Sequence, residues 1–236
     1  MPDSLSAFDE TTSTEAFTLQ NPKLLKVSLR AITVQAKLGA MVAYQGDVKF
    51  EHAGQGGMGR MLKKAMTGEG QSLMKISGSG EVFLAETAQE IHVIQLENDK
   101  ITVNGANLLA FDAGIDWSIE RMQGVSGIMG GGMYNTALSG TGAVAILSDG
   151  PPVRLDVGSA PTYADPQAAI TWSSGVTTSV KTDVSFRTLT GRGSGESVQM
   201  AFGGQGWVLV QPSEGRPVPT AASGGSSGGL GGLLKG

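Results

Sequence analysis

The sequence predicts an all-β protein of three tandem β-sandwich-like repeats, with at most one or two short helices. Glycine makes up 36 of 236 residues and aromatic residues only 6%, a composition that favours strands and tight turns over a helical bundle. Apolar and polar residues alternate over long stretches, as they do in half-buried strands. One short phrase occurs three times at nearly even spacing, which indicates a triplicated structural unit.

The repeated phrase has the pattern small-Gly-x-Gly-x-Val-x-aliphatic. Its copies are SGSGEVFL at 77–84, SGTGAVAI at 139–146 and GGQGWVLV at 203–210. Each copy predicts a strand covered on both faces. The expected core pairs are Val82 and Leu84, Val144 and Ile146, and Val208 and Val210. The paired glycines before each strand are expected to take a positive φ or to let another backbone approach closely; these structural glycines are Gly78, Gly80, Gly140, Gly142, Gly204 and Gly206.

Composition along the chain predicts its organisation. Residues 1–15 are polar and acidic and are expected to form a flexible leader. Residues 16–211 form a single β domain, and residues 212–236 a disordered tail rich in Pro, Gly and Ser. The repeats cover about 16–85, 86–147 and 148–211. At the start of the domain, Leu25, Val27 and Leu29 alternate with polar residues and predict a strand with one polar face.

Charge and cysteine content exclude several classes of function. The net charge is −4, which argues against nucleic acid as a partner because phosphate binding needs clustered Lys and Arg. The absence of cysteine excludes disulfides, thiolate zinc sites and thiol catalysis. The N-terminus shows no secretory signal, and no apolar run is long enough to cross a membrane. These features favour the cytoplasm.

No sequence motif in its context supports an enzymatic function. The segment Gly54–Gly59 matches G-x-G-x-x-G, but no βαβ unit follows it, so we interpret the match as chance in a glycine-rich chain. His52 and His92 are isolated and predict no metal site. Asp112, Asp116 and Glu120 have the spacing of turn and strand positions rather than of a calcium loop. We therefore predict no catalytic residue, no cofactor and no metal, and a protein that is not an enzyme.

Two segments could contact a partner. The stretch 60–66 predicts a short helix with Met and Leu on one face and Arg60, Lys63 and Lys64 on the other. This basic patch suits acidic lipid or a partner protein, whereas the alternative is a helix packed on the β body with its lysines in water. The tail carries Leu230, Leu233 and Leu234, which suit either a docking peptide or a solubilising tail.

Several stretches resemble a known family. They are GGMGRMLKKAMTGE at 56–69, GSGEVFLA at 78–85, GESVQMAFGGQGWVLVQ at 195–211 and LGAMVAY at 38–44. Over about residues 17–211 the chain is similar to the bacterial branch of the altered-inheritance-of-mitochondria (mitochondrial biogenesis) AIM-type family. It departs from the family pattern at the inserted Gly70-Gln71 and in the middle repeat, which lacks the Gly-Glu step.

The resemblance implies a fold like that of the trp RNA-binding attenuation protein. Three β-sandwich-like units, with swapped N-terminal strands, would then surround a pseudo-threefold axis. The resemblance implies no catalytic residues; eukaryotic members of the family are tied to mitochondrial membrane organisation. That fold relative binds RNA, but this is analogy of fold alone.

The leading hypothesis is a non-enzymatic scaffold or protein-interaction module with an unknown protein partner. The first alternative is a peripheral membrane-associated organising protein that uses the basic patch of Arg60, Lys63 and Lys64. The second is binding of a small ligand between repeats, which requires a pocket lined by convergent polar groups. Whether the protein forms a homo-oligomer stays open.

Overall fold

The all-β class is confirmed in the computed structural model, which describes residues 3–30, 32–52, 72–121, 134–181 and 199–214. In these ranges the helices are two short 3-10 turns, η1 (Asp3–Phe8) and η2 (Gly105–Asn107). None of the described helices is long and apolar enough to span a membrane. The predicted helix at 60–66 lies outside the described residues.

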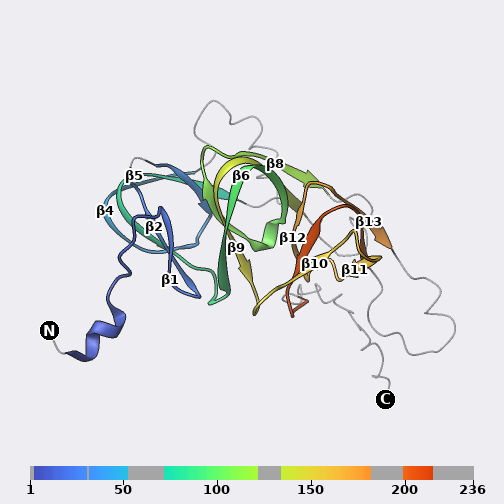
Figure 1. Ribbon diagram of the computed structural model, residues 1–236. Helices are drawn as coiled ribbons and strands as arrows, with labels where there is room; N and C mark the ends of the chain where they lie inside the picture. Colours follow the sequence, from blue (N-terminus) through green and yellow to red (C-terminus); the bar gives the residue numbers. More distant parts are fainter. Residues whose placement is uncertain (1–2, 31, 53–71, 122–133, 182–198, 215–236) are drawn as a thin grey trace, which may run out of the picture.

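The strands fall into three groups that follow one another along the length of the molecule (Figure 1). The first group contains β1 (Phe17–Asn21), β2 (Leu24–Ser28), β3 (Val34–Lys37), β4 (Met41–His52) and β5 (Leu73–Leu84). The second contains β6 (Glu90–Asn104), β7 (Leu108–Asp112), β8 (Asp116–Arg121) and β9 (Tyr134–Ser148). The third contains β10 (Val153–Asp156), β11 (Thr162–Ala164), β12 (Ala169–Ser173), β13 (Val176–Lys181), β14 (Gln199–Gly204) and β15 (Trp207–Val210).

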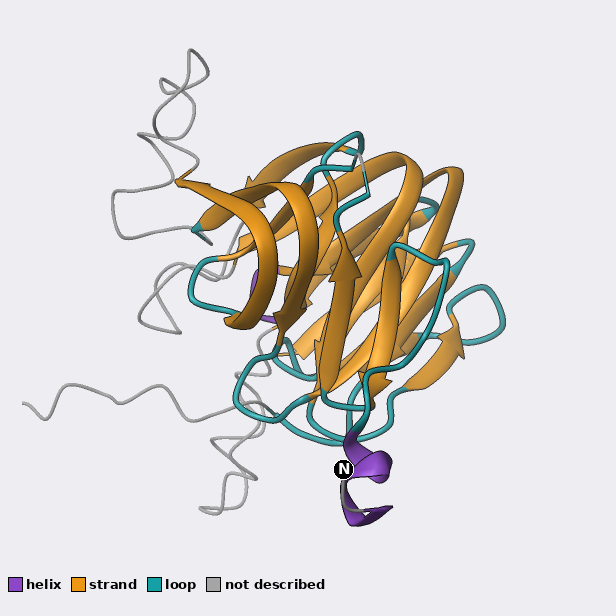
Figure 2. Ribbon diagram, turned by 90° about the vertical axis from the view of Figure 1, so that its left-hand side faces the viewer, coloured by secondary structure: helices purple, strands orange, loops and turns teal. Residues whose placement is uncertain are grey.

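Most strands belong to one 12-stranded antiparallel sheet that runs through all three groups. Its path is β1-β2-β5-β3-β7-β9-β6-β12-β15-β10, with β4 added on β5 and β8 on β9. A three-stranded sheet, β11-β14-β13, completes the third group. Figure 2 shows the strands side by side, with η1 standing apart from them. The path is open and ends at β1 and β10; the swapped N-terminal strands and the pseudo-threefold axis stay predictions.

Strand pairing joins each group to the next. The first and second groups meet where β3 pairs with β7, from Val34 opposite Asp112 to Ala36 opposite Ala110. The second and third groups meet where β12 pairs with β6, and Thr102 lies opposite Trp172. The seams are therefore continuous sheet rather than flexible linkers.

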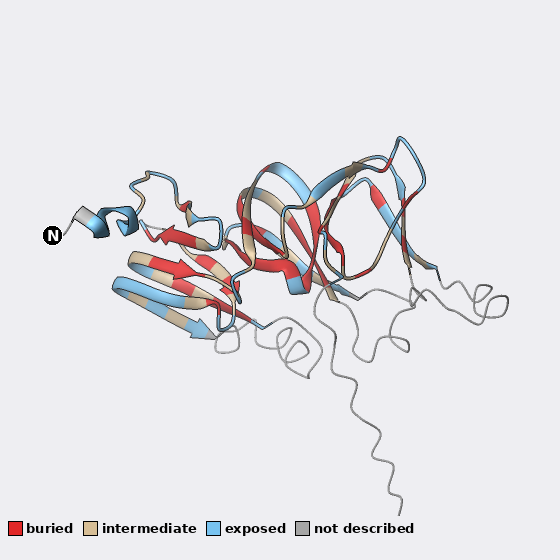
Figure 3. Cartoon of the chain, turned by 90° about the horizontal axis from the view of Figure 1, so that it is seen from below, coloured by how far each residue is buried: buried red, intermediate tan, exposed pale blue. Residues whose placement is uncertain are grey.

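Three clusters of buried apolar side chains form the core, and Figure 3 shows buried segments recurring along the row of groups. One strand serves two of these clusters. On β9, Ala143, Ala145 and Leu147 pack in the first cluster, while Val144 and Ile146 pack in the second. This arrangement follows from the alternation of side chains along a strand and agrees, for β9, with the expectation of a strand covered on both faces.

The predicted core residues are largely confirmed. Five of them are fully buried, namely Val82, Leu84, Val144, Ile146 and Val208. Val210 is only half-buried, because it ends β15 and the chain leaves the sheet there. Strand β2, which contains Leu25 and Val27, differs from its prediction in another way.

The expected polar face of that strand is covered. Leu25, Val27 and Leu29 are fully buried as predicted, but Lys26 and Ser28 are buried as well. The Lys26 Nζ lies 2.9 Å from Glu10 Oε2 and 3.2 Å from the Thr11 carbonyl oxygen. The Ser28 hydroxyl donates to Glu81 Oε2 at 2.6 Å. Residues of the leader thus lie over this face of β2.

All six glycines of the repeated phrase have a positive φ, between 91° and 154°. At Gly80, a Cβ would overlap the Gln45 carbonyl oxygen of the paired strand β4. At Gly206, a Cβ would overlap the Ser173 hydroxyl. Gly80 and Gly206 therefore combine the two features expected of these glycines, a positive φ and the close approach of a neighbouring group.

Candidate functional site

Some residues singled out from the sequence cannot be placed. The segment Gly54–Gly59 and the basic patch of Arg60, Lys63 and Lys64 lie outside the described residues, as do the leucines of the tail. His52 ends β4, and its side chain is outside the described part.

His92 has a partner that the sequence did not indicate. Its Nε2 is hydrogen-bonded to Ser148 Oγ at 2.8 Å. Burial lowers the pKa of His92, and the nearby charge of Glu90 opposes this effect. A Ser–His pair can act as a nucleophile and base, but Ser148 is fully buried. The pair therefore links the paired strands β6 and β9 in the interior of the sheet.

The three acidic residues occupy turn and strand positions, as predicted. Asp112 ends β7, Asp116 begins β8 and Glu120 lies within β8. Asp112 Oδ2 accepts a hydrogen bond from the Ala143 backbone N–H at 2.8 Å. Among the described residues, no group of three His, Asp or Glu side chains could hold a metal ion.

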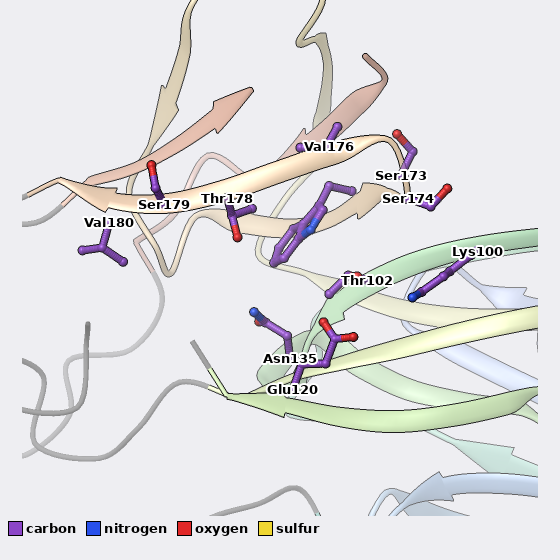
Figure 4. Close-up of a pocket in the computed structure, with 11 residues that line it drawn as sticks. Lys100, Thr102, Glu120, Asn135, Ser173, Ser174, Val176, Thr178, Ser179 and Val180 are labelled. Carbon is purple, nitrogen blue, oxygen red and sulfur yellow. The ribbon is translucent and has the colours of Figure 1, made fainter. Parts of the chain in front are cut away.

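A pocket of about 380 Å³ lies at the seam between the second and third groups (Figure 4). Strands β6, β8 and β9 form one side, and β12, β13 and the turn between them form the other. Its lining residues are Lys100, Thr102, Glu120, Asn135, Trp172, Ser173, Ser174, Val176, Thr178, Ser179 and Val180. Most carry hydroxyl, amide or charged groups, so this seam is polar.

Strand register explains why these side chains converge. Asn135 lies directly opposite Glu120 of β8 and opposite Asn104 of β6. Residues directly opposite in a pair share one face of the sheet, and every second residue along a strand does so too. Lys100 and Thr102 therefore share the face of Asn104. The second group presents a row of polar side chains to the third.

Asn135 is the most unusual residue of the pocket. Its side chain is 4% exposed, and its Oδ1 has no hydrogen-bond partner. Its neighbour across the strand pair is different, because Asn104 Nδ2 lies 3.3 Å from the carbonyl oxygens of both Pro166 and Ala169. Buried polar atoms are nearly always paired. Asn135 thus places an unpaired, buried acceptor in the lining of the pocket.

The pocket also carries two opposite charges. Lys100 and Glu120 are exposed, and neither forms an ion pair with another described residue. In Figure 4 the Glu120 carboxylate lies beside Asn135, and Lys100 enters from the other end. A bound molecule would meet an acceptor-rich end and a cationic end.

The third group supplies a firm wall. Trp172 is 4% exposed and makes an edge-to-face contact with Phe202 at 5.7 Å between ring centroids. Ser173 Oγ accepts a hydrogen bond from the Trp207 backbone N–H at 3.1 Å. Gly206 permits this approach, since a side chain there would displace the Ser173 hydroxyl.

Sequence reasoning missed the pocket because its residues come from five strands and one turn. A weak signal was nevertheless present. Asparagine is depleted in strands, yet Asn104 and Asn135 both lie within long strand patterns. Asparagines at such positions need a hydrogen-bonding partner from elsewhere in the fold.

Fold and site together define an all-β protein with a polar pocket at the seam between strand groups. The chain belongs to the mitochondrial biogenesis AIM24 family, whose model matches residues 17–213; the resemblance found in the sequence is confirmed. No curated protein sequence matches the chain.

A solved structure shares the fold. It is the crystal structure of protein SPYM3_0169 from Streptococcus pyogenes, with a TM-score of 0.65 and 21% sequence identity. The match covers 84% of this chain and 92% of that chain. The likeness extends over nearly the whole of the bacterial protein and concerns the fold alone.

Proposed function

We propose that this AIM24-family chain is a non-enzymatic, cytoplasmic binding module that holds a small polar ligand in the pocket between the second and third groups. The observation that carries the proposal is the buried Oδ1 of Asn135, which lines the pocket without a partner. An unpaired buried acceptor costs about 1–3 kcal/mol. A ligand that donates a hydrogen bond to this atom would recover that free energy.

The dimensions of the pocket support this function. Its volume of about 380 Å³ falls within the ~300–1,000 Å³ typical of small-molecule sites. The buried Trp172 and Val176 supply apolar contacts, and the surrounding hydroxyl, amide and charged groups supply direction. Apolar walls with a few convergent polar groups are characteristic of binding sites.

We also propose that the three strand groups are diverged copies of one unit and act as the scaffold of the site. The positive φ at both glycines of every copy supports this view. In each copy a fully buried valine, Val82, Val144 or Val208, stands two residues after the second glycine. The scaffold would occupy about residues 16–211, between a leader and a tail.

The replacement Asn135→Leu tests the proposed function, because leucine has a similar size and lacks the acceptor. We expect unchanged or higher stability in urea unfolding, and loss of the thermal shift produced by whichever compound binds from a panel of small polar metabolites. The matched control is Asn104→Leu, which removes bonds to two backbone carbonyls and should lower stability. Equal destabilisation by both replacements would show that Asn135 has a structural role only.

A protein-interaction scaffold is the second candidate. Among the described strands, β4 pairs with β5 alone, so it presents a free edge. Val42 and Tyr44 on this strand are 57% and 50% exposed. Free edges accept added strands from other chains. Sedimentation of wild type and of Val42→Lys would test self-association through this edge. If both proteins self-associate to the same extent, the edge of β4 is not the contact.

Peripheral membrane contact through Arg60, Lys63 and Lys64 stays a prediction. Flotation of the full chain with vesicles rich in anionic lipid would support it. Flotation that is unchanged when all three residues are replaced by Gln would contradict it.

A further inference from the structure

We infer that the ligand of the pocket is a small zwitterion, an α-amino acid or a dipeptide. Its ammonium group binds at Asn135 and Glu120, and its carboxylate binds at Lys100. The inference rests on the proposed function and specifies the class of ligand.

The ammonium end is formed by two acceptors on neighbouring strands. Asn135 and Glu120 lie directly opposite each other in the β8–β9 pair, and their side chains lie side by side in Figure 4. Asn135 contributes a neutral oxygen without a partner, and Glu120 contributes a carboxylate. An ammonium group carries three donors and a positive charge, so one group can satisfy both residues.

The carboxylate end lies toward Lys100 and the turn between β12 and β13. Ser173 ends β12, Ser174 begins the turn, and both line the pocket with Lys100. The Ser173 hydroxyl itself is held by the Trp207 N–H on β15, so Lys100 supplies the donor for a carboxylate here. The bond from Lys100 to that carboxylate would be charge-assisted.

Other classes of ligand use these groups less well. A simple anion would be repelled by Glu120, and a simple cation by Lys100. A neutral sugar would leave both charges without a partner. A zwitterion pairs with both charges and donates to Asn135 at once.

The test is calorimetric titration of the full chain with L-alanine and L-alanyl-L-alanine. N-acetyl-L-alanine lacks the cation, L-alaninamide lacks the anion, and glucose lacks both. We expect binding of at least one zwitterion, with each blocked analogue weaker by about tenfold or more, as expected for loss of one charge-assisted bond. Equal binding of N-acetyl-L-alanine or L-alaninamide would overturn the inference.

Variants locate each end of the ligand. Glu120→Gln should weaken the zwitterion about tenfold and leave N-acetyl-L-alanine unaffected, whereas Lys100→Gln should leave L-alaninamide unaffected. Glu97→Gln and Lys49→Gln are matched controls, because both positions are exposed and lie outside the pocket. The analogue series on wild-type protein decides the question even if a variant folds poorly.

Failure of this inference and failure of the proposed function give different results. Asn135-dependent binding of glucose without binding of amino acids would overturn the zwitterion and leave the binding function intact. No thermal shift from any panel compound, with no heat from either zwitterion, would overturn both.

Discussion

Asn107 and Gln211, 104 residues apart in the chain, are joined by a hydrogen bond from Nδ2 to Oε1 of 3.4 Å. The same Oε1 accepts from the Asp149 backbone N–H at 2.9 Å, and Gln211 Nε2 donates to the Gln167 carbonyl oxygen at 3.1 Å. Gln211 is 5% exposed. One glutamine therefore fastens the end of the third group to η2 of the second.

Gln211→Ala should lower the free energy of unfolding by about 1–3 kcal/mol, because it leaves buried partners without hydrogen bonds. Urea denaturation measures the change. Gln95→Ala, at an exposed position of β6, is the control and should stay within about 0.5 kcal/mol of wild type. Equal effects of the two replacements would mean that the network contributes nothing.

Stability should fall in mildly acidic solution because of His92. Burial lowers the pKa of His92 from its ordinary value of 6.5, so the unfolded chain takes up the proton at higher pH than the folded chain. The stabilising contribution is complete above pH 6.5 and is lost as the pH falls through the lower folded-state pKa.

The check is urea unfolding of wild type and His92→Gln from about pH 8 to about pH 5, the range in which histidine titrates. Glutamine can keep a bond to Ser148 but does not take up the proton, so the curve of the variant should be flatter. An identical pH dependence in both proteins would assign the titration to another group.

Gly80→Ala should destabilise the protein by at least about 2 kcal/mol, since it combines an unfavourable φ with a steric overlap on Gln45. Gly39 and Gly114 separate the two effects. Gly39 has a φ of +86° and open space, whereas Gly114 has open space alone. Thermal unfolding should rank the alanine variants Gly80, Gly39, Gly114 from most to least destabilised; any other order contradicts the steric argument.

Lys26→Met should release the leader. Lys26 Nζ contacts Glu10 and Thr11, and the Thr11 backbone N–H donates to Gln20 Oε1 at 2.8 Å. Hydrogen exchange at the Thr11 amide should become faster in the variant. Lys23→Met, at an exposed position of the same β1–β2 hairpin, should leave the exchange rate unchanged. Unchanged exchange in both variants would show that Gln20 alone holds the segment.

Local patterns were sufficient for the class of fold and for much of the core. Val82 and Val144 could be predicted as buried because each lies in a short apolar run after a glycine pair, and β structure depends there on the immediate neighbours. The covered face of Lys26 could not be predicted, because Glu10 and Glu81 reach it from distant parts of the chain.

The site was harder to predict than the core. Asn135, Glu120 and Lys100 become neighbours only through strand register across separate hairpins. The wall opposite them, with Trp172, comes from another group of strands. The spacing of these residues in the sequence does not indicate that they converge. The repeated phrase, in contrast, indicates a buried strand from its own residues.

The alternating side chains of β9 have a consequence for folding and for evolution. Because Ala145 and Ile146 serve different clusters, the first and second groups cannot melt separately, and calorimetry should show them in a single transition. A cut between these groups would strip one cluster of its lining. Loss or gain of a strand group during evolution would therefore also change β9, the strand that lines both clusters.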